Sequence, residues 1–129
     1  MIALDTNVVV RLLVGDDPAQ TRRARALLAR RTVLILPTVL LETEWVLRGA
    51  YGIDRSAIAG SMRKLLGLPN VEVAKPQAVS EALGWFDAGL DFTDALHLAL
   101  AEDAEAMVTF DARLAKRARR ITARDIRAL

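Results

Sequence analysis

The first fourteen residues, MIALDTNVVVRLLV (residues 1–14), place a short apolar run, a polar trio and a second apolar stretch in succession. The run Ile2–Leu4 predicts a strand, and the trio Asp5–Asn7 consists of residue types that commonly begin helices. The stretch Val8–Val14 then predicts the helix itself. A strand that leads directly into a helix is the repeating unit of α/β proteins.

The same alternation continues along the chain. Further strands are expected at 33–36, 71–73 and 106–110, with a short edge strand at 121–122. Helices are expected at 19–31, 37–49, 56–66, 76–86, 91–103 and 113–119. This order predicts a three-layer α/β/α sandwich around a mostly parallel central sheet of four to five strands. No repeat or linker interrupts it, so we expect one domain over residues 1–129.

Composition narrows the class of protein. The chain has 129 residues, of which 53% are hydrophobic and 26% are charged, so it is long enough to bury a core without disulfides or a structural metal. It contains no cysteine, which excludes disulfides, thiolate zinc sites, iron–sulfur clusters and a cysteine nucleophile. No uncharged apolar run approaches the ~20 residues of a membrane span, and no secretory leader pattern is present. We therefore expect a cytoplasmic protein with no membrane partner.

Two aspartates directly follow expected strands. Asp5 comes after the first strand and Asp111 after the strand at 106–110. Ligands of parallel sheets bind outside the carboxyl ends of the strands, where both side chains would reach one cleft. Each aspartate also suits a simple helix-capping role. The sequence leaves both interpretations open.

Two glutamates share the expected helix at 37–49. Glu44 has Arg48 four residues later, which predicts an ordinary exposed ion pair. Glu42 has mostly apolar neighbours at helical spacing and no basic partner, so burying its charge would be costly unless a cation meets it. The alternative is that Glu42 lies at the exposed edge of the apolar stripe. The neighbours in question are Thr38, Val39, Trp45 and Val46.

Asp91 and Asp94 begin a helix whose interior, Ala95–Ala101, is hydrophobic on nearly every side. We expect this helix to run through the centre of the domain, with Asp91 or Thr93 as its cap. Asp94 would lie in the first turn, where backbone N–H groups and the helix dipole tend to keep a carboxylate ionised. The alternative is that Asp91 and Asp94 only cap the helix and have no further role. His97 is expected in the core or at a cleft wall, because no second metal-ligating imidazole or thiol stands at suitable spacing.

Asp5, Glu42, Asp94 and Asp111 have in common that no Lys or Arg stands three or four positions away. If the four carboxylates converge, a cation must offset their mutual repulsion. A site made only of oxygen ligands suits a hard ion, Mg²⁺ or Mn²⁺.

Four segments in this order resemble the PIN-domain family, and most closely the VapC-type ribonuclease toxins of prokaryotic toxin–antitoxin pairs. The resemblance spans nearly the whole chain and implies a PIN-like fold. The segments are Met1–Asn7 with its Asp-Thr-Asn signature, Leu40–Arg48, Asp91–Ala99 and Thr109–Asp111.

The resemblance implies a metal-dependent endoribonuclease. Its acidic quartet, Asp5, Glu42, Asp94 and Asp111, would bind Mg²⁺ or Mn²⁺ and hydrolyse phosphodiester bonds in RNA. The residues that would line the site are Thr6, Asn7, Asp91 and Thr109. Glu44 is expected to be a bystander charge.

The resemblance also implies partners, namely a VapB-like antitoxin whose C-terminal segment covers the cleft, and a second copy of the chain in a homodimer. The apolar-rich stretches Val8–Val14 and Trp45–Tyr51 would accept such partners, or would fill the core of the domain itself.

Charge is unevenly distributed along the chain. Residues 1–111 hold 11 basic and 15 acidic side chains, a net charge of −4, whereas residues 112–129 hold 7 and 1, a net charge of +6. The basic end would attract RNA phosphates, or it is simply a solvated helix face. Its candidate RNA-binding residues are Arg113, Lys116, Arg117, Arg119 and Arg120.

Two other functions compete with this one. A catalytically inactive PIN-fold module that binds RNA or protein would be marked by a lost acidic position, but all four are present. A phosphoacceptor or aspartyl-phosphate hydrolase also begins with an aspartate after its first strand. Such domains need a second aspartate beside the first and a lysine after a later strand, and the three lysines do not follow the central strands.

Overall fold

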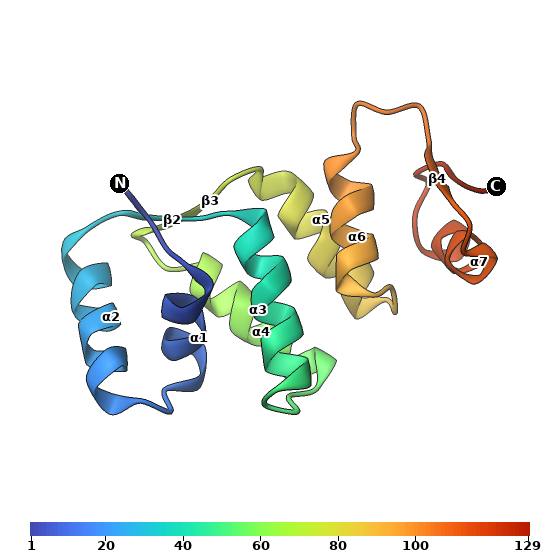
Figure 1. Ribbon diagram of the computed structural model, residues 1–129. Coiled ribbons are helices and arrows are strands. Elements are labelled where there is room, and N and C mark those ends of the chain that lie inside the picture. Colours follow the sequence, from blue (N-terminus) through green and yellow to red (C-terminus); the bar gives the residue numbers. More distant parts are fainter. The chain divides into compact units, whose positions relative to one another are not determined.

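The computed structural model describes residues 1–129 and contains seven helices and five strands (Figure 1). The chain divides into two compact units, Met1–Pro76 and Gln77–Leu129. The single domain over residues 1–129 stays a prediction.

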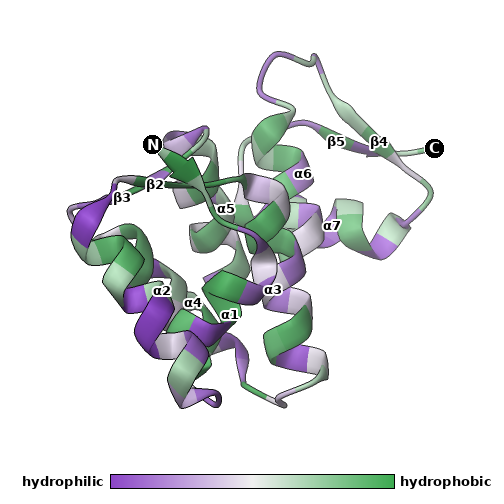
Figure 2. Cartoon of the chain, turned by 60° about the vertical axis from the view of Figure 1, so that its left-hand side comes forward, coloured by the Kyte–Doolittle hydropathy of each residue, from purple (hydrophilic) through white to green (hydrophobic).

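The first unit contains a three-stranded parallel sheet. Strand β2 (Val33–Ile35) lies between β1 (Ile2–Ala3) and β3 (Val71–Val73), with Val33 opposite both Ile2 and Val71. Val33 and Ile35 are fully buried, in keeping with the continuous apolar sequence of a central parallel strand (Figure 2). Asp5 therefore follows an edge strand of this sheet.

Four helices connect and cover these strands, and local sequence signals explain where they begin. Pro18 and Pro37 occupy first helical positions, where the missing N–H costs nothing. Gly15 ends the first helix with a φ of 70°, a left-handed conformation that glycine adopts without strain. The helices are α1 (Thr6–Val14), α2 (Pro18–Arg30), α3 (Pro37–Gly49) and α4 (Arg55–Leu66).

The second unit holds three helices and a two-stranded parallel sheet. The sheet pairs β4 (Met107–Thr109) with β5 (Ile126–Ala128). The rings of Phe86 and Phe92 meet edge to face with centroids 5.4 Å apart, and both side chains are buried. The helices are α5 (Pro76–Asp87), α6 (Phe92–Leu100) and α7 (Ala112–Ile121).

The predicted α/β class, with parallel strands connected through helices, is confirmed. The four to five strands expected in one sheet are five strands divided between a three-stranded and a two-stranded sheet. The helix expected at 91–103 ends earlier, at Leu100. None of the helices is long and apolar enough to cross a membrane.

The edge strand predicted at Ile121-Thr122 is wrong. Ile121 is the last residue of α7, whose buried face of Leu114, Ala115 and Ala118 carries the helix to that point, and Thr122 follows as its cap. The strand β5 lies further along, where Ile126 is buried opposite Met107.

Candidate active site

Asp5 lies between β1 and α1 and occupies the N-cap position of α1. Its side chain is exposed and accepts no capping hydrogen bond from the helix. Asp17 and Asp54, in the same unit, do cap their helices, accepting hydrogen bonds from the backbone N–H groups of Gln20 and Ala57. The Asp5 carboxylate is thus available for another role.

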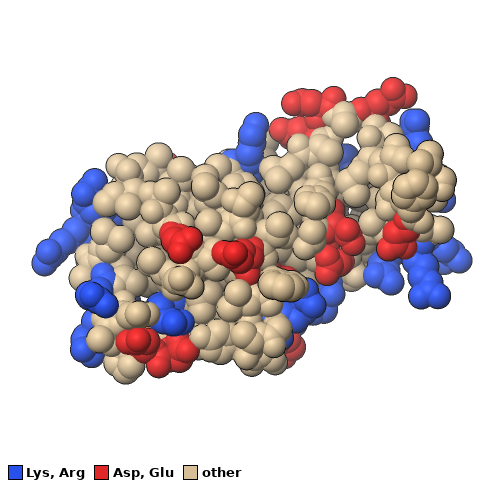
Figure 3. Space-filling model, in the orientation of Figure 1, with Lys and Arg blue, Asp and Glu red and all other residues tan.

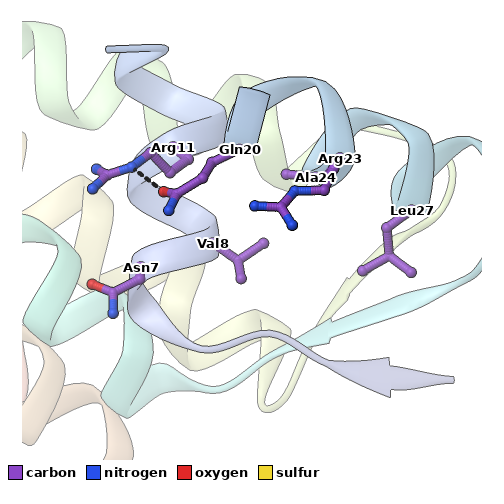
Figure 4. A pocket seen from close by; sticks show the side chains of 7 residues that line it. All are labelled: Asn7, Val8, Arg11, Gln20, Arg23, Ala24 and Leu27. Atoms are coloured by element: carbon purple, nitrogen blue, oxygen red, sulfur yellow. Dashed lines mark hydrogen bonds between the residues drawn. The ribbon is translucent and has the colours of Figure 1, made fainter. Parts of the chain in front are cut away.

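The two residues after Asp5 differ in exposure. Thr6 is buried and packs at the base of α1, whereas Asn7 is exposed and lines a cavity between α1 and α2 (Figure 4). Of the two, Asn7 is therefore the residue whose side chain can reach a ligand.

The burial of Glu42 and Glu44 is the opposite of what the sequence predicts. Glu42 is exposed, whereas Glu44 is 1% exposed and accepts a hydrogen bond of 2.9 Å from Arg48 Nε. The prediction of an exposed Glu44 pair is wrong, and so is the placement of Glu42 on a buried apolar face. The alternative, an exposed Glu42, is what the structure shows.

The reason is the face that α3 buries. Its buried residues are Leu40, Thr43, Glu44 and Leu47, which recur at helical spacing and exclude position 42. Trp45, counted among the apolar neighbours of Glu42, is 68% exposed. The ion pair with Arg48 compensates the buried charge of Glu44, and the Glu42 carboxylate is left at the surface.

In the second unit, Asp94 is half-buried in the first turn of α6. Its pKa is raised, first by burial and then by the negative charges of Asp91 and Asp111, while His97 and Arg117 act in the opposite direction. Burial and the neighbouring negative charges thus outweigh the stabilising effect that the start of the helix is expected to have on the charged form of Asp94. A raised carboxyl pKa near like charges is typical of functional sites, where a cation completes the electrostatics.

The neighbours of Asp94 on α6 have distinct tasks. Asp91 is the N-cap and accepts a hydrogen bond of 3.2 Å from the Thr93 N–H, as expected. His97 is exposed, so the expectation of a core position is wrong, and α6 is not buried on every side. Leu100, also on this helix, is 40% exposed.

Asp111 performs the capping role that the sequence left open for it. Its Oδ1 accepts a hydrogen bond of 3.0 Å from the Leu114 N–H at the start of α7. Its own backbone N–H donates to Thr109 Oγ1 at 3.0 Å. Thr109 thereby holds the turn after β4, and capping engages one carboxylate oxygen of Asp111.

The donor set of these acidic residues suits a hard divalent ion, because it consists of carboxylate oxygens. Each unit holds two of the four expected ligands. No group of three or more carboxylate or imidazole side chains lies at a spacing that would hold a metal ion. The metal site of the four carboxylates accordingly stays a prediction.

Basic side chains gather on two helices. All five candidate RNA-binding residues of α7 are exposed, and the helix buries only its apolar face. Figure 3 shows where basic side chains gather on one face of the molecule. Sequence reasoning missed α2, because its arginines were counted within a net acidic part of the chain. The available signal was a run without any acidic residue from 18 to 41. The exposed arginines of this run are Arg22, Arg23, Arg25, Arg30 and Arg31.

These features define a class, that of α/β proteins with acidic residues at strand ends and helix starts and with exposed basic helices. The chain belongs to the PIN domain family, whose model matches residues 2–120. PIN domains are generally nucleases and typically use divalent metal ions. Searches of curated proteins and of solved structures gave no significant match.

Proposed function

We propose that this PIN domain is a metal-dependent endoribonuclease that acts as the VapC-type toxin of a toxin–antitoxin pair. The observation that carries the nuclease proposal is Asp94, half-buried beside Asp91 and Asp111 with a raised pKa. A divalent cation would stabilise these neighbouring carboxylates in their charged form, and metal-assisted hydrolysis requires a site that binds such an ion.

The residues that would hold Mg²⁺ or Mn²⁺ are Asp5, Glu42, Asp94 and Asp111. Such an ion, when bound, lowers the pKa of a coordinated water and offsets charge on the scissile phosphate. Supporting this set, the side chain of Asp5 caps no helix and Glu42 is exposed. Asp91 and Thr109 would position the ligands Asp94 and Asp111. Asp91 does so through its hydrogen bond at the start of α6, and Thr109 through its hydrogen bond in the turn after β4.

The substrate proposed is RNA. The exposed basic residues of α7 provide attraction for phosphates that an acidic site alone would repel. Arg117 is near enough to Asp94 to lower its pKa, so a basic side chain lies close to the acidic residues of this unit. Binding by such contacts weakens as the salt concentration rises.

The partners proposed are a VapB-like antitoxin and a second copy of the chain, in the cytoplasm. Trp45 on α3 is 68% exposed, which supports a partner surface on the stretch Trp45–Tyr51. In the stretch Val8–Val14, by contrast, Val9 and Val10 are buried in the unit's own core. If an antitoxin arginine enters the acidic site, adding antitoxin should abolish Mn²⁺ binding.

The test is cleavage of a panel of structured and single-stranded RNAs by the purified chain with Mn²⁺ or Mg²⁺. Asp5→Asn and Asp94→Asn should each abolish cleavage. The matched controls are Glu72→Gln in the first unit and Asp103→Asn in the second, both exposed acidic residues outside the proposed site, and both should cut like the unaltered chain. RNA binding without cleavage under any metal condition would instead favour an inactive binding module.

A further inference from the structure

A cavity of about 380 Å³ lies between α1 and α2 of the first unit (Figure 4). Val8 of α1 and Ala24 and Leu27 of α2 form its apolar wall. Its volume is within the range of small-molecule sites, and an apolar wall with a few polar groups is the usual composition of such sites.

The polar side chains at this cavity include two arginines in different situations. Arg11 is engaged, because its Nε donates to Gln20 Oε1 at 2.7 Å and its Nη1 approaches Asp16 and Tyr51 at 3.3 Å. The side chain of Arg23, by contrast, makes no hydrogen bond or ion pair with other residues of the chain. In Figure 4 its guanidinium extends from α2 toward α1. Its donors are therefore free for an anionic ligand.

A third polar residue connects the cavity to the proposed acidic site. Asn7 lines the cavity and stands two positions after Asp5, at the same end of α1. Its amide can both donate and accept hydrogen bonds, as the edge of a nucleobase requires. No carboxylate lines the cavity.

We propose that this cavity binds one nucleotide of the RNA substrate, adjacent to the bond that is cut. Arg23 would hold a phosphate of that nucleotide by charge-assisted hydrogen bonds, and its base would lie against Val8, Ala24 and Leu27. The inference rests on the proposed nuclease function. It adds that the residues of this cavity select the nucleotide next to the cleaved bond. A free anion would not need the apolar wall, and an apolar peptide would leave Arg23 without a partner.

The first experiment measures binding of a fluorescent oligoribonucleotide in the presence of a chelator, so that no cleavage occurs. Arg23→Gln should weaken binding about tenfold, as expected for the loss of a charge-assisted hydrogen bond. Arg22→Gln is the matched control, because Arg22 is an exposed neighbour on the same helix that does not line the cavity. It removes the same charge and should weaken binding less than about twofold. Equal losses in the two variants would overturn the proposal.

The second experiment follows the methyl resonances of Val8, Ala24 and Leu27 during titration with uridine or adenosine 5′-monophosphate and, separately, with inorganic phosphate. The proposal requires shifts with a nucleotide that phosphate does not reproduce. Shifts with both alike, or with neither, would overturn it.

Failure of the nuclease proposal looks different from failure of this one. If the nucleotide shifts occur but the chain cuts no RNA with either metal, nucleotide binding in the cavity stands, whereas the nuclease function falls and with it the place of that nucleotide beside a cleaved bond. If the chain cuts RNA and Arg23→Gln leaves KM at the value of Arg22→Gln, the nuclease function stands and the cavity inference falls.

Discussion

Arg48 and Glu44 form an ion pair one turn apart on α3, with Nε and Oε1 separated by 2.9 Å, and the carboxylate side is buried while the guanidinium side is half exposed. The pair explains how α3 tolerates a charge on the face that packs against its unit. It also separates Glu44 from Glu42, two residues away, whose carboxylate is exposed.

Arg48→Gln should destabilise the fold by about 1 to 3 kcal/mol, because it leaves the Glu44 carboxylate buried without its charged partner. Urea unfolding measures the loss. Arg48 makes further interactions, so the double variant Glu44→Gln/Arg48→Gln isolates the pair. The double variant should be more stable than Arg48→Gln alone, and a double variant that is less stable would contradict a charge-pairing role.

Glu42→Gln should change the free energy of unfolding by less than about 0.5 kcal/mol relative to the unaltered chain, since the side chain is exposed. The same variant should lower RNA cleavage at least about 100-fold if Glu42 holds the metal, because even residues that only orient metal ligands cost 10- to 100-fold. Comparison with Glu44→Gln in the same two assays decides which glutamate serves the site. Loss of cleavage in Glu44→Gln alone, at unchanged stability, would reassign the role.

The pH dependence of the free energy of unfolding should reveal the raised pKa of Asp94. Its raised pKa means that the folded chain binds this proton more tightly than the unfolded chain, so stability falls as pH rises from about 4, the unfolded value, through the folded pKa. Asp94→Asn removes this penalty and should therefore raise Tm at neutral pH, while the difference from the unaltered chain disappears in acid. A Tm difference that is the same at all pH values would show that packing, rather than ionisation, is responsible.

Thr43→Val should stabilise the fold by about 1 kcal/mol, which corresponds to a rise in Tm of about 3 to 5 °C. Thr43 is fully buried and its Oγ1 has no hydrogen-bond partner, so the methyl group removes an unsatisfied polar atom. Thr38→Val, at an exposed position of the same helix, is the control and should change Tm little. A lower Tm for Thr43→Val would indicate that a buried water satisfies the hydroxyl.

Much of the fold follows from local signals in the sequence. The helix starts at Pro18, Pro37 and Arg55, and the aspartates that follow β1 and β4, depend on neighbouring residues only. For the same reason the positions of Asp5 and Asp111 at helix N-caps could be predicted. Which of them uses its side chain to cap depends on geometry that the sequence does not contain, and only Asp111 does so.

The rest depends on tertiary packing. Whether Glu42 or Glu44 is buried is decided by the face of α3 that meets its unit, and both residues have apolar neighbours at helical spacing. Strand β5 at Ile126–Ala128 is defined by its pairing with β4, and a segment of three residues is too short for its hydrophobic pattern to predict a strand. The raised pKa of Asp94 arises from burial and from Asp91 and Asp111, one of which is distant in sequence.

Mn²⁺ should raise the Tm of the unaltered chain, because an ion that binds only the folded state stabilises it by RT ln(1 + [ion]/Kd), about 1.4 kcal/mol at ten times Kd. The pKa of Asp94 is raised first by burial and then by the charges of Asp91 and Asp111, and a bound cation would offset those charges, so this residue is a sensitive reporter of the ion. Asp94→Asn should therefore lose the Mn²⁺ effect while gaining basal stability at neutral pH, a combination that general loss of folding cannot produce. Asp103→Asn is the control and should keep the full Mn²⁺ shift. If Mn²⁺ raises the Tm of Asp94→Asn as much as that of the unaltered chain, the ion binds elsewhere, and Asp94 is not a metal ligand.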